Sequence, residues 1–390
     1  MEKTWRWFGK NDKITLPMLR QIGVEGIVTA LHEIPNGEVW PLEAILNQKT
    51  YIETYGLRWS VVESLPVSEA IKYGGAERDN LIENYKKSLI NLGKAGVKTV
   101  CYNFMPVIDW IRTDLEHLWE DGTSSLYFDK IRFAYFDCLI LQRAEAEKDY
   151  TVNELKQMYE LDKVITDAEK EELVDTIIIK TQGFVNGNIK NGDKNPVDTF
   201  HHLLAPYKGI DRDALRENLR YFLQAIMPVC DEYGINMCIH PDDPPFPVLG
   251  LPRIVTCEED IAWILHAVNN PHNGLTFCAG SLSAGLHNNV PALARMFAHR
   301  THFVHLRSTN AFPNFIEASH LGGRAHIIEL IRIFEKERPG VPMRVDHGRM
   351  MLGDTDKGYN PGYSFHGRMM ALAQIEGMMA VVNDESKLES

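Results

Sequence analysis

Short apolar runs alternate along the chain with segments whose apolar residues recur every three or four positions, which is the pattern of strands followed by helices. The apolar runs predict strands at residues 6–9, 26–30, 58–63, 99–104, 236–240, 274–278, 301–306 and 342–347. Helical periodicity predicts helices at residues 16–22, 42–55, 80–95, 211–233, 257–269, 289–299, 324–336 and 363–382. Eight strands, each with a helix after it, predict a (β/α)8 TIM barrel, and continuous apolar strands suit a parallel sheet buried on both faces.

A doubly wound open sheet is the alternative fold for this alternation. No G-x-G-x-x-G motif follows the first expected strand, which disfavours the dinucleotide-binding version of that fold. The length of 390 residues is in the range of one TIM barrel with insertions. We therefore expect a single catalytic domain over residues 1–390.

Residues 106–210 interrupt the alternation and predict an insertion after the fourth strand. A charged helical stretch at residues 143–173 precedes the Gly- and Asn-rich run GFVNGNIKNGDKNP at residues 183–196, which is typical of an exposed loop. The insertion could cover the mouth of the barrel as a lid. An oligomerisation arm or simple solvated helices explain it equally well, since charge-rich helices alone carry no function.

Composition points to a small-molecule partner. The net charge of -12 and pI of about 5.7 provide no general basic field for nucleic acid or an anionic membrane. The N-terminus has no apolar signal segment, and no run approaches the roughly 18 apolar residues of a membrane span, so a cytoplasmic protein is expected. The six cysteines are scattered without CxxC spacing, which does not imply disulfides.

Four metal-type ligands end apolar runs in the second half of the chain: His240, Cys278, His305 and Asp346. Each imidazole or thiol alone would more often be a structural residue. A parallel barrel brings its strand ends to one mouth, however, so four such residues at four successive strand ends predict a shared metal site. Two imidazoles, a carboxylate and a thiolate suit Zn²⁺, Fe²⁺ or Mn²⁺, and the sulfur argues against an all-oxygen Mg²⁺ or Ca²⁺ site.

Further polar residues are expected at strand ends or in the loops that follow: Asn103, Arg307, Ser308, His347, Arg349 and Tyr363. The planar fork of Arg307 could bind a carboxylate in a bidentate manner, or form an ion pair inside the barrel. Asp242 and Asp243 could support the ligands or cap a turn. His320 and Arg324 could reach the mouth, although an ordinary loop is favoured there.

Several segments together resemble the metal-dependent mannonate dehydratase family of the bacterial hexuronate pathway, which is unrelated to the enolase-type dehydratases. The motifs that carry the resemblance are IHPDDPP, TFCAGS, VHLRST with the following SHLGG, MRVDHGR and NPGYSFHGR, together with WRWFG and YNFMPVIDW nearer the N-terminus. The likeness covers essentially the whole chain. One departure is Val345, where the family pattern usually has proline before the metal-binding aspartate.

The resemblance implies that His240, Cys278, His305 and Asp346 bind Mn²⁺ or Fe²⁺. It also implies that the substrate is the sugar acid D-mannonate, which loses water to give 2-keto-3-deoxy-D-gluconate in glucuronate catabolism. We expect a homo-oligomer that binds neither nucleic acid nor a membrane.

Removing a proton next to a carboxylate develops charge that a metal and an arginine can stabilise, while the departing hydroxide needs a proton. Arg307 is therefore expected to bind the substrate carboxylate. His347 and Tyr363 are expected to transfer protons, with Tyr359 as an alternative to Tyr363. The remaining polar residues, Asn103, Ser308 and Arg349, are expected to contact substrate.

Other function classes remain open at this point. A related barrel could be a sugar isomerase or an endonuclease-type phosphodiesterase, but Cys278 and the acidic composition disfavour both. A non-catalytic metal-binding protein would instead have a closed coordination sphere and convert no aldonate.

Overall fold

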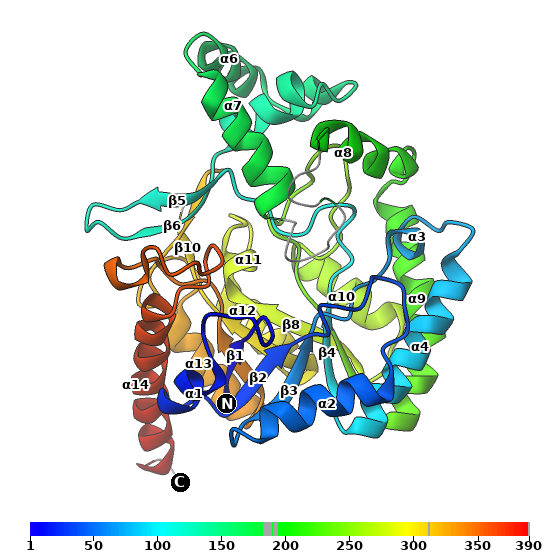
Figure 1. The fold of residues 1–390 in the computed structure, drawn as a ribbon, viewed down its shortest axis with the longest axis vertical. Helices are drawn as coiled ribbons and strands as arrows, with labels where there is room; N and C mark the ends of the chain where they lie inside the picture. Colours follow the sequence, from blue (N-terminus) through cyan, green and yellow to red (C-terminus); the bar gives the residue numbers. More distant parts are fainter. Residues whose placement is uncertain (182–188, 190–193, 311–312, 389–390) are drawn as a thin grey trace.

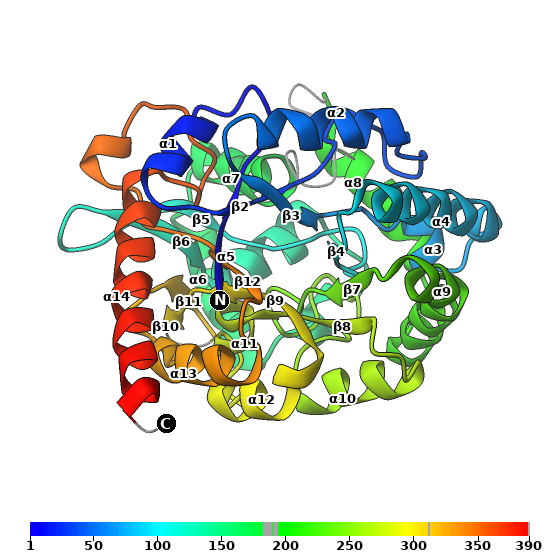
Figure 2. The same ribbon diagram turned by 90° about the horizontal axis from the view of Figure 1, so that it is seen from below.

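The computed structural model describes residues 1–181, 189, 194–310 and 313–388, and within them parallel strands close into a barrel (Figures 1 and 2). The order around the barrel is β1 (Glu2–Arg6), β12 (Pro342–Val345), β9 (Thr301–Leu306), β8 (Asn273–Cys278), β7 (Asn236–Ile239), β4 (Thr99–Tyr102), β3 (Arg58–Glu63) and β2 (Gly26–Thr29). This closed ring confirms the TIM-barrel prediction and excludes the open sheet.

Helices surround the strands, as the view from below shows (Figure 2). They are α1 (Leu16–Gln21), α2 (Leu42–Glu53), α3 (Glu69–Lys72), α4 (Arg78–Ala95), α9 (Arg212–Tyr233), α10 (Glu258–Ala267), α11 (Ala279–Ser283), α12 (Val290–Phe297), α13 (Ile327–Glu337) and α14 (His366–Leu388). The helices predicted from the sequence are confirmed with small shifts at their ends. Gly96, with φ of 78°, ends α4 in the left-handed conformation that favours glycine.

The prediction of the first strand was wrong: β1 covers Glu2–Arg6 instead of residues 6–9. The segment EKTWR has no apolar run, because Thr4 and Arg6 are buried polar residues in the barrel wall. Thr4 pairs with Gly26 of β2 and Arg344 of β12, so its burial results from strand pairing. A polar pattern inside a barrel cannot be recognised from hydrophobicity alone.

Two apolar cores stabilise the barrel. All six residues of β8 and of β9 are buried, as expected for strands of a parallel sheet that is covered on both faces. The larger core lies between the strands and the helices, whereas a small cluster consists of Val28, Val61, Cys101, Cys238 and Phe303. Burying a side chain of the valine or phenylalanine size contributes about 1.5–3 kcal/mol, so these layers fix the positions of the strand ends.

Between β4 and β7 the chain forms a separate group of elements that projects above the barrel (Figure 1). Its parts are β5 (Asp114–Leu118), β6 (Ser124–Phe128), α5 (Lys130–Tyr135), α6 (Val152–Asp162), α7 (Asp167–Val174) and α8 (Pro196–Leu204), with the short helical turns η1 (Phe136–Ile140), η2 (Ala146–Asp149), η3 (Asp175–Lys180) and η4 (Ala205–Tyr207). The division of the chain into one barrel domain and an insertion stays a prediction.

The charged stretch at residues 143–173 is two helices rather than one. Thr151 begins α6 and Thr166 begins α7, and each threonine forms a capping box with a glutamate three residues later. The sequence did not predict the hairpin of β5 and β6. Most of the Gly- and Asn-rich run at residues 183–196, and with it the prediction of a lid, lies outside the described residues.

A second sheet joins the projecting segment to the loop after β9. It contains β10 (Thr309–Asn310), β11 (Phe315–Glu317), β6 and β5 in that order, and the pairings are antiparallel. Phe315 pairs with Phe128, and their rings stack with centroids 5.1 Å apart. This sheet holds the chain around Arg112, just before β5, near Glu317 at the end of β11.

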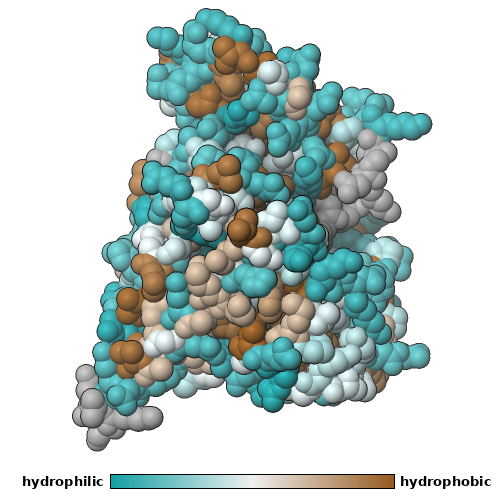
Figure 3. Space-filling model, turned by 60° about the vertical axis from the view of Figure 1, so that its left-hand side comes forward, coloured by the Kyte–Doolittle hydropathy of each residue, from teal (hydrophilic) through white to brown (hydrophobic). Residues whose placement is uncertain are grey.

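The face in Figure 3 is hydrophilic around its rim, whereas hydrophobic residues, tan and brown, gather in the middle of its lower half. Among the described residues, no helix is both long and apolar enough to cross a membrane.

Candidate functional site

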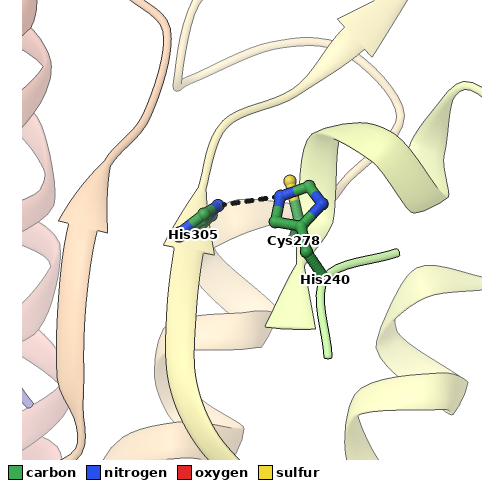
Figure 4. Close-up of side chains that lie close together, drawn as sticks. All are labelled: His240, Cys278 and His305. Atoms are coloured by element: carbon green, nitrogen blue, oxygen red, sulfur yellow. Dashed lines mark hydrogen bonds between the residues drawn. The ribbon is translucent and has the colours of Figure 1, made fainter. Parts of the chain in front are cut away.

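Three of the four predicted ligands converge at the C-terminal mouth of the barrel. His240 follows β7, Cys278 ends β8 and His305 lies on β9, and one ligand atom of each lies within 4.8 Å of the others (Figure 4). Nε2 of His240 is 3.3 Å from Nδ1 of His305. Two imidazole nitrogens and one sulfur facing one another are a donor set that fits a transition-metal ion.

The fourth predicted ligand, Asp346, lies beside this group. Its Oδ2 atom is 3.7 Å from Nδ1 of His305 and 3.8 Å from the sulfur of Cys278. Both of its oxygens also contact arginines: Oδ2 accepts a hydrogen bond from Nε of Arg307 at 2.7 Å, and Oδ1 is 2.5 Å from Nη1 of Arg344. Asp346 therefore lies between the three convergent ligands and the two arginines, Arg307 and Arg344.

This charge distribution favours a thiolate. Burial raises the pKa of the Cys278 thiol, but Arg307 and His240 outweigh burial and hold that pKa well below the usual value. Burial likewise opposes the ionised form of Asp346, and Arg344 is the strongest of the groups that nevertheless keep its pKa well below the usual value. A thiolate and a carboxylate are the forms in which these side chains bind metal.

Glu63, at the end of β3, contacts the same group from the opposite face of His305. Its Oε1 atom lies 3.2 Å from Nε2 of His305, while Nδ1 of that ring faces His240. Nε of Arg344 lies 3.0 Å from Oε2 of Glu63 and 3.1 Å from Nε2 of His305. Nη2 of Arg344 donates to Oε1 of Glu63 at 3.1 Å, and when Nε2 of His305 carries the proton it donates to the same carboxylate, so that Nδ1 keeps its lone pair.

A cavity of about 600 Å³, a figure that includes its open mouth, lies over these residues. His347 and Tyr363 line it side by side, with ring centroids 5.3 Å apart and planes at 83°. Trp110 covers His347 at a centroid distance of 5.4 Å and comes from the segment between β4 and β7. The predicted proton-transfer residues therefore share one wall of the cavity.

The environments of these two residues differ. Nδ1 of His347 is 3.0 Å from Oε1 of Glu317, a contact that holds the ring and directs Nε2 elsewhere. Burial raises the pKa of Tyr363 and Arg344 opposes this increase only in part, so the pKa is about 12. The phenol is consequently protonated at neutral pH and is suited to donate a proton or a hydrogen bond.

Arg307 is buried and every one of its nitrogens has a protein acceptor. Nε donates to Asp346, Nη1 donates to Glu317 at 2.9 Å, and Nη2 donates to Asp243 and to Ser281. This arrangement is the ion-pair alternative for Arg307, while binding of a substrate carboxylate by Arg307 stays a prediction. Its guanidinium contacts three buried protein carboxylates.

A second buried arginine, Arg112, completes this network. It binds Asp243 through two nitrogens, at 2.8 and 3.1 Å, and donates to Glu317 at 2.7 Å. Arg112 and Arg307 hold the pKa of Asp243 below its usual range despite burial. The network joins the segment before β5 to the loops after β7 and β9.

The remaining predicted substrate contacts separate into two groups. Asn103 lines the cavity and donates to Asp109 at 2.8 Å. Ser308 instead accepts a hydrogen bond from the backbone of Ala325, and Arg349 donates to Asp121 of the hairpin loop. Neither Ser308 nor Arg349 is among the described residues that line the cavity.

Asp242, His320, Arg324 and Tyr359 are not among the described residues that line the cavity. Asp242 accepts hydrogen bonds from the backbone of residues 254 and 255, and Arg324 donates to the carbonyl of Ser283. His320 is buried, which lowers its pKa to about 4, and it does not line the cavity in the described part of the chain. Tyr359 is also outside the described cavity lining.

Sequence reasoning missed several functional residues, namely Arg6, Glu63, Arg112, Glu317 and Arg344. Arg6 and Glu63 are the last residues of strands β1 and β3, so the rule that polar strand ends meet at the mouth could have identified them. Arg112 and Glu317 depend on the second sheet, which the sequence did not reveal.

Comparison with known proteins agrees with this geometry. The family model described as D-mannonate dehydratase (UxuA) matches residues 1–389. A mannonate dehydratase of Marinomonas sp. (strain MWYL1) is 45% identical over 390 residues, covering 97% of this chain and 98% of that protein. One from Chromohalobacter salexigens is 43% identical and covers 98% of this chain and 99% of its own length.

A solved structure gives the same result in three dimensions. The mannonate dehydratase of Streptococcus suis serotype 2 superimposes with a TM-score of 0.78 at 34% identity, over 99% of this chain and 96% of that one.

Proposed function

The chain belongs to the D-mannonate dehydratase family, and from this premise we propose how its cavity removes water from D-mannonate. The reaction of this family is the loss of water from that sugar acid, and the curated relatives of this chain have the same name. The observation that carries the proposal is that His347 and Tyr363 contact each other and line the same cavity as His240, which converges with Cys278 and His305.

The elimination needs two proton transfers, and the enol that it forms then rearranges. The proton on C2 of the substrate leaves, and the electron pair of that C–H bond is held by the carboxylate group as an enediolate. That pair then forms the C2–C3 double bond as the C3–O bond breaks. The departing hydroxyl takes up a proton and leaves as water, and the resulting enol gains a proton at C3 as it becomes the 2-keto acid. One group must therefore accept a proton and another must donate one.

His347 accepts the C2 proton and Tyr363 protonates the leaving hydroxyl in this proposal. Glu317 fixes the His347 ring through Nδ1, so Nε2 is the basic nitrogen. Tyr363 is the donor because its raised pKa keeps the phenol protonated. The opposite order, with tyrosine as base, would require an ionised phenol in a buried site.

A divalent metal held by His240, Cys278, His305 and Asp346 is part of the proposal. When bound, such an ion supplies Lewis acidity that stabilises negative charge on substrate oxygens. Glu63 orients His305 so that Nδ1 faces the other ligands, and Arg344 holds Glu63 and Asp346 in place. We propose Mn²⁺ or Fe²⁺, and a place for the reaction in glucuronate catabolism.

An isotope experiment separates the two roles. Metal-loaded protein is incubated with D-mannonate in D₂O, and both release of the keto acid and exchange of the C2 hydrogen are measured by NMR. We expect Tyr363→Phe to exchange C2 hydrogen much faster than it releases product, because the base remains, and His347→Asn to do neither at an appreciable rate. Exchange by His347→Asn and none by Tyr363→Phe would reverse the assignment.

The same assay tests the reaction and the metal. Metal-free protein is supplied in turn with Mn²⁺, Fe²⁺, Zn²⁺ or Mg²⁺ and given a panel of hexonates. We expect keto-acid release from D-mannonate with Mn²⁺ or Fe²⁺. Full activity of protein shown to be free of metal would contradict the four-ligand site.

A further inference from the structure

Three buried arginines line the cavity: Arg6 at the end of β1, Arg307 after β9 and Arg344 on β12. A hexonate brings one carboxylate into this cavity, and burying that charge costs free energy unless a cation is available to pair with it. The three arginines differ in how many of their N–H groups the protein itself already uses. That difference indicates which of them is available to the substrate.

Two of the arginines are each ion-paired with more than one protein carboxylate. Arg307 contacts Asp243, Glu317 and Asp346, as described above. Arg344 pairs with Glu63 through Nε at 3.0 Å and Nη2 at 3.1 Å, and with Asp346 through Nη1 at 2.5 Å. Neither can bind a substrate carboxylate without giving up a buried acid.

Arg6 has a different environment. Nη1 donates to the backbone carbonyl of Glu63, and this is the one hydrogen bond of its guanidinium to the described part of the chain. The group packs on the Phe8 ring, 4.9 Å from its centroid, and the residue is only 8% exposed. Nε and Nη2 therefore have no acceptor among the described residues.

The electrostatic balance follows the same division. Burial lowers the pKa of Arg307 and Arg344, but the acids beside them reverse this and raise both pKa values. For Arg6 burial is stronger than the attraction of Glu63, and its pKa stays below the usual value. Of the three cavity arginines, Arg6 is thus the one whose positive charge is least compensated by nearby protein carboxylates.

The position of Arg6 suits the reacting end of the substrate. Phe8 lies between Arg6 and Tyr363, with ring centroids of Phe8 and Tyr363 5.0 Å apart, and Tyr363 is in contact with His347. The carboxylate carbon of a hexonate is bonded directly to C2, the atom that loses the proton. A carboxylate held at Arg6 would therefore place C2 close to the proton-transfer residues.

We propose that Arg6 binds the carboxylate of the hexonate through a two-point contact of its guanidinium and so selects sugar acids over neutral sugars. This proposal rests on the proposed function, since it names the group that recognises the substrate of the same cavity. A bidentate guanidinium–carboxylate pair combines charge with a fixed geometry, and in a buried site it orients the ligand as well as holding it.

A double-mutant cycle between protein and ligand tests the proposal. Binding of D-mannonate and of its neutral amide to metal-loaded protein is measured by calorimetry in the slow variant Tyr363→Phe, which serves as the background. Arg6→Gln is introduced into that background. The charge-matched control is Arg58→Gln, because Arg58 is an exposed arginine at the start of β3, the end away from Glu63, where it pairs with Glu2 of β1.

We expect the background protein and the Arg58→Gln control to prefer the acid over the amide. Arg6→Gln should weaken binding of the acid by roughly 10- to 100-fold, the range for loss of a charge-assisted hydrogen bond, and leave the amide nearly unchanged. An unchanged preference for the acid in Arg6→Gln, or an equal loss for both ligands, would overturn the proposal.

Two further measurements keep the outcome interpretable. If Arg6→Gln does not fold, Arg6→Lys is compared with the background instead, because lysine retains the charge but lacks the two-point fork. If Arg6→Lys prefers the acid over the amide as strongly as the background protein does, the bidentate contact is ruled out. Release of keto acid by the wild-type protein is measured in parallel. Its absence would refute the proposed function, whereas its presence with an unchanged acid preference refutes only the role of Arg6.

Discussion

Oε1 of Glu63 lies 3.2 Å from Nε2 of His305, across the barrel mouth from the ligand group that Nδ1 of the same ring faces. Burial opposes ionisation of Glu63, but Arg344 and His305 hold its pKa well below the usual value, so the carboxylate is charged. A carboxylate behind a ligating imidazole fixes the tautomer and raises the basicity of the other nitrogen. Glu63 should therefore govern metal affinity without binding the metal.

The variant Glu63→Gln tests this relationship. The amide keeps the shape of the side chain but loses the charge, so we expect affinity for Mn²⁺ to fall by roughly 10- to 100-fold. Affinity is measured by competition with a chelating dye, independently of turnover. Glu83→Gln makes the same chemical change at an exposed ion pair on α4 and should leave affinity at the wild-type value. Equal affinities in both variants would show that Glu63 has no part in orienting His305.

Cys278→Ser and Asp346→Asn each remove a proposed ligand. We expect both to abolish keto-acid release while the far-UV circular dichroism stays native, and to weaken metal binding by more than the roughly 10- to 100-fold cost of an outer contact. Cys138→Ser, in η1 outside the described cavity lining, is the matched control for the thiol. Wild-type turnover with metal still bound in either ligand variant would refute the four-ligand assignment.

The strand ends that carry His240, Cys278 and His305 could be predicted from the sequence because their strands are buried on both faces and stand out as apolar runs. Arg6 and Glu63 occupy equivalent ends of β1 and β3. Strand β1 escaped prediction because Thr4 and Arg6 interrupt its apolar pattern. Its position is fixed by pairing with strands β2 and β12, which is a property of the closed barrel rather than of the local sequence.

The ion-pair network around Arg307 could not be predicted from the sequence for a different reason. Its partners are Asp243, Glu317 and Asp346, which lie far apart along the chain and meet only because the second sheet carries Glu317 to the mouth. Short strands such as β10 and β11 have too few residues for a periodic signal. The sequence therefore indicated that Arg307 needs a carboxylate but not whether the carboxylate belongs to the protein or to the substrate.

Glu317→Gln should change the pH dependence of stability. Burial alone would raise the pKa of Glu317, but Arg307 and His347 lower it to about 2, compared with 4.5 for an unperturbed glutamate. The lowered pKa means that ionised Glu317 contributes stability above pH 4.5 and that this contribution is lost as pH falls toward 2, by at most about 1.4 kcal/mol per pH unit. We expect Glu317→Gln to be less stable by about 3 kcal/mol at pH 7, the scale for breaking a buried ion pair.

Urea unfolding of Glu317→Gln and wild type between pH 7 and pH 2.5 measures this effect. The difference in unfolding free energy should shrink below pH 4.5, because the carboxyl there takes up a proton in the unfolded chain while it stays ionised in the folded one. A difference that stays constant over this range would mean that Glu317 is not ionised in the folded protein.

Tyr363→Phe deletes the proposed proton donor and keeps the ring that packs against Phe8 and His347. We expect kcat to fall by roughly 100-fold or more, the usual scale for a positioned acid, with metal affinity unchanged. Tyr359→Phe is the control, because Tyr359 is outside the described cavity lining. A normal kcat in Tyr363→Phe together with a reduced one in Tyr359→Phe would transfer the role to Tyr359.

Arg307→Lys distinguishes a structural arginine from one that binds substrate. A lysine has a single ammonium and cannot contact Asp243, Glu317 and Asp346 in the directions that the guanidinium fork reaches, so buried carboxylates would lose partners. We expect the metal-free variant to lose about 3–5 kcal/mol of stability and the Mn²⁺ affinity to fall, because Asp346 is no longer held. Arg295→Lys, at an exposed pair with Glu329, makes the same exchange on the surface and should change neither quantity. If Arg307→Lys were instead as stable as wild type and raised only KM, Arg307 would bind the substrate carboxylate, and the buried ion pairs would contribute little to holding the site together.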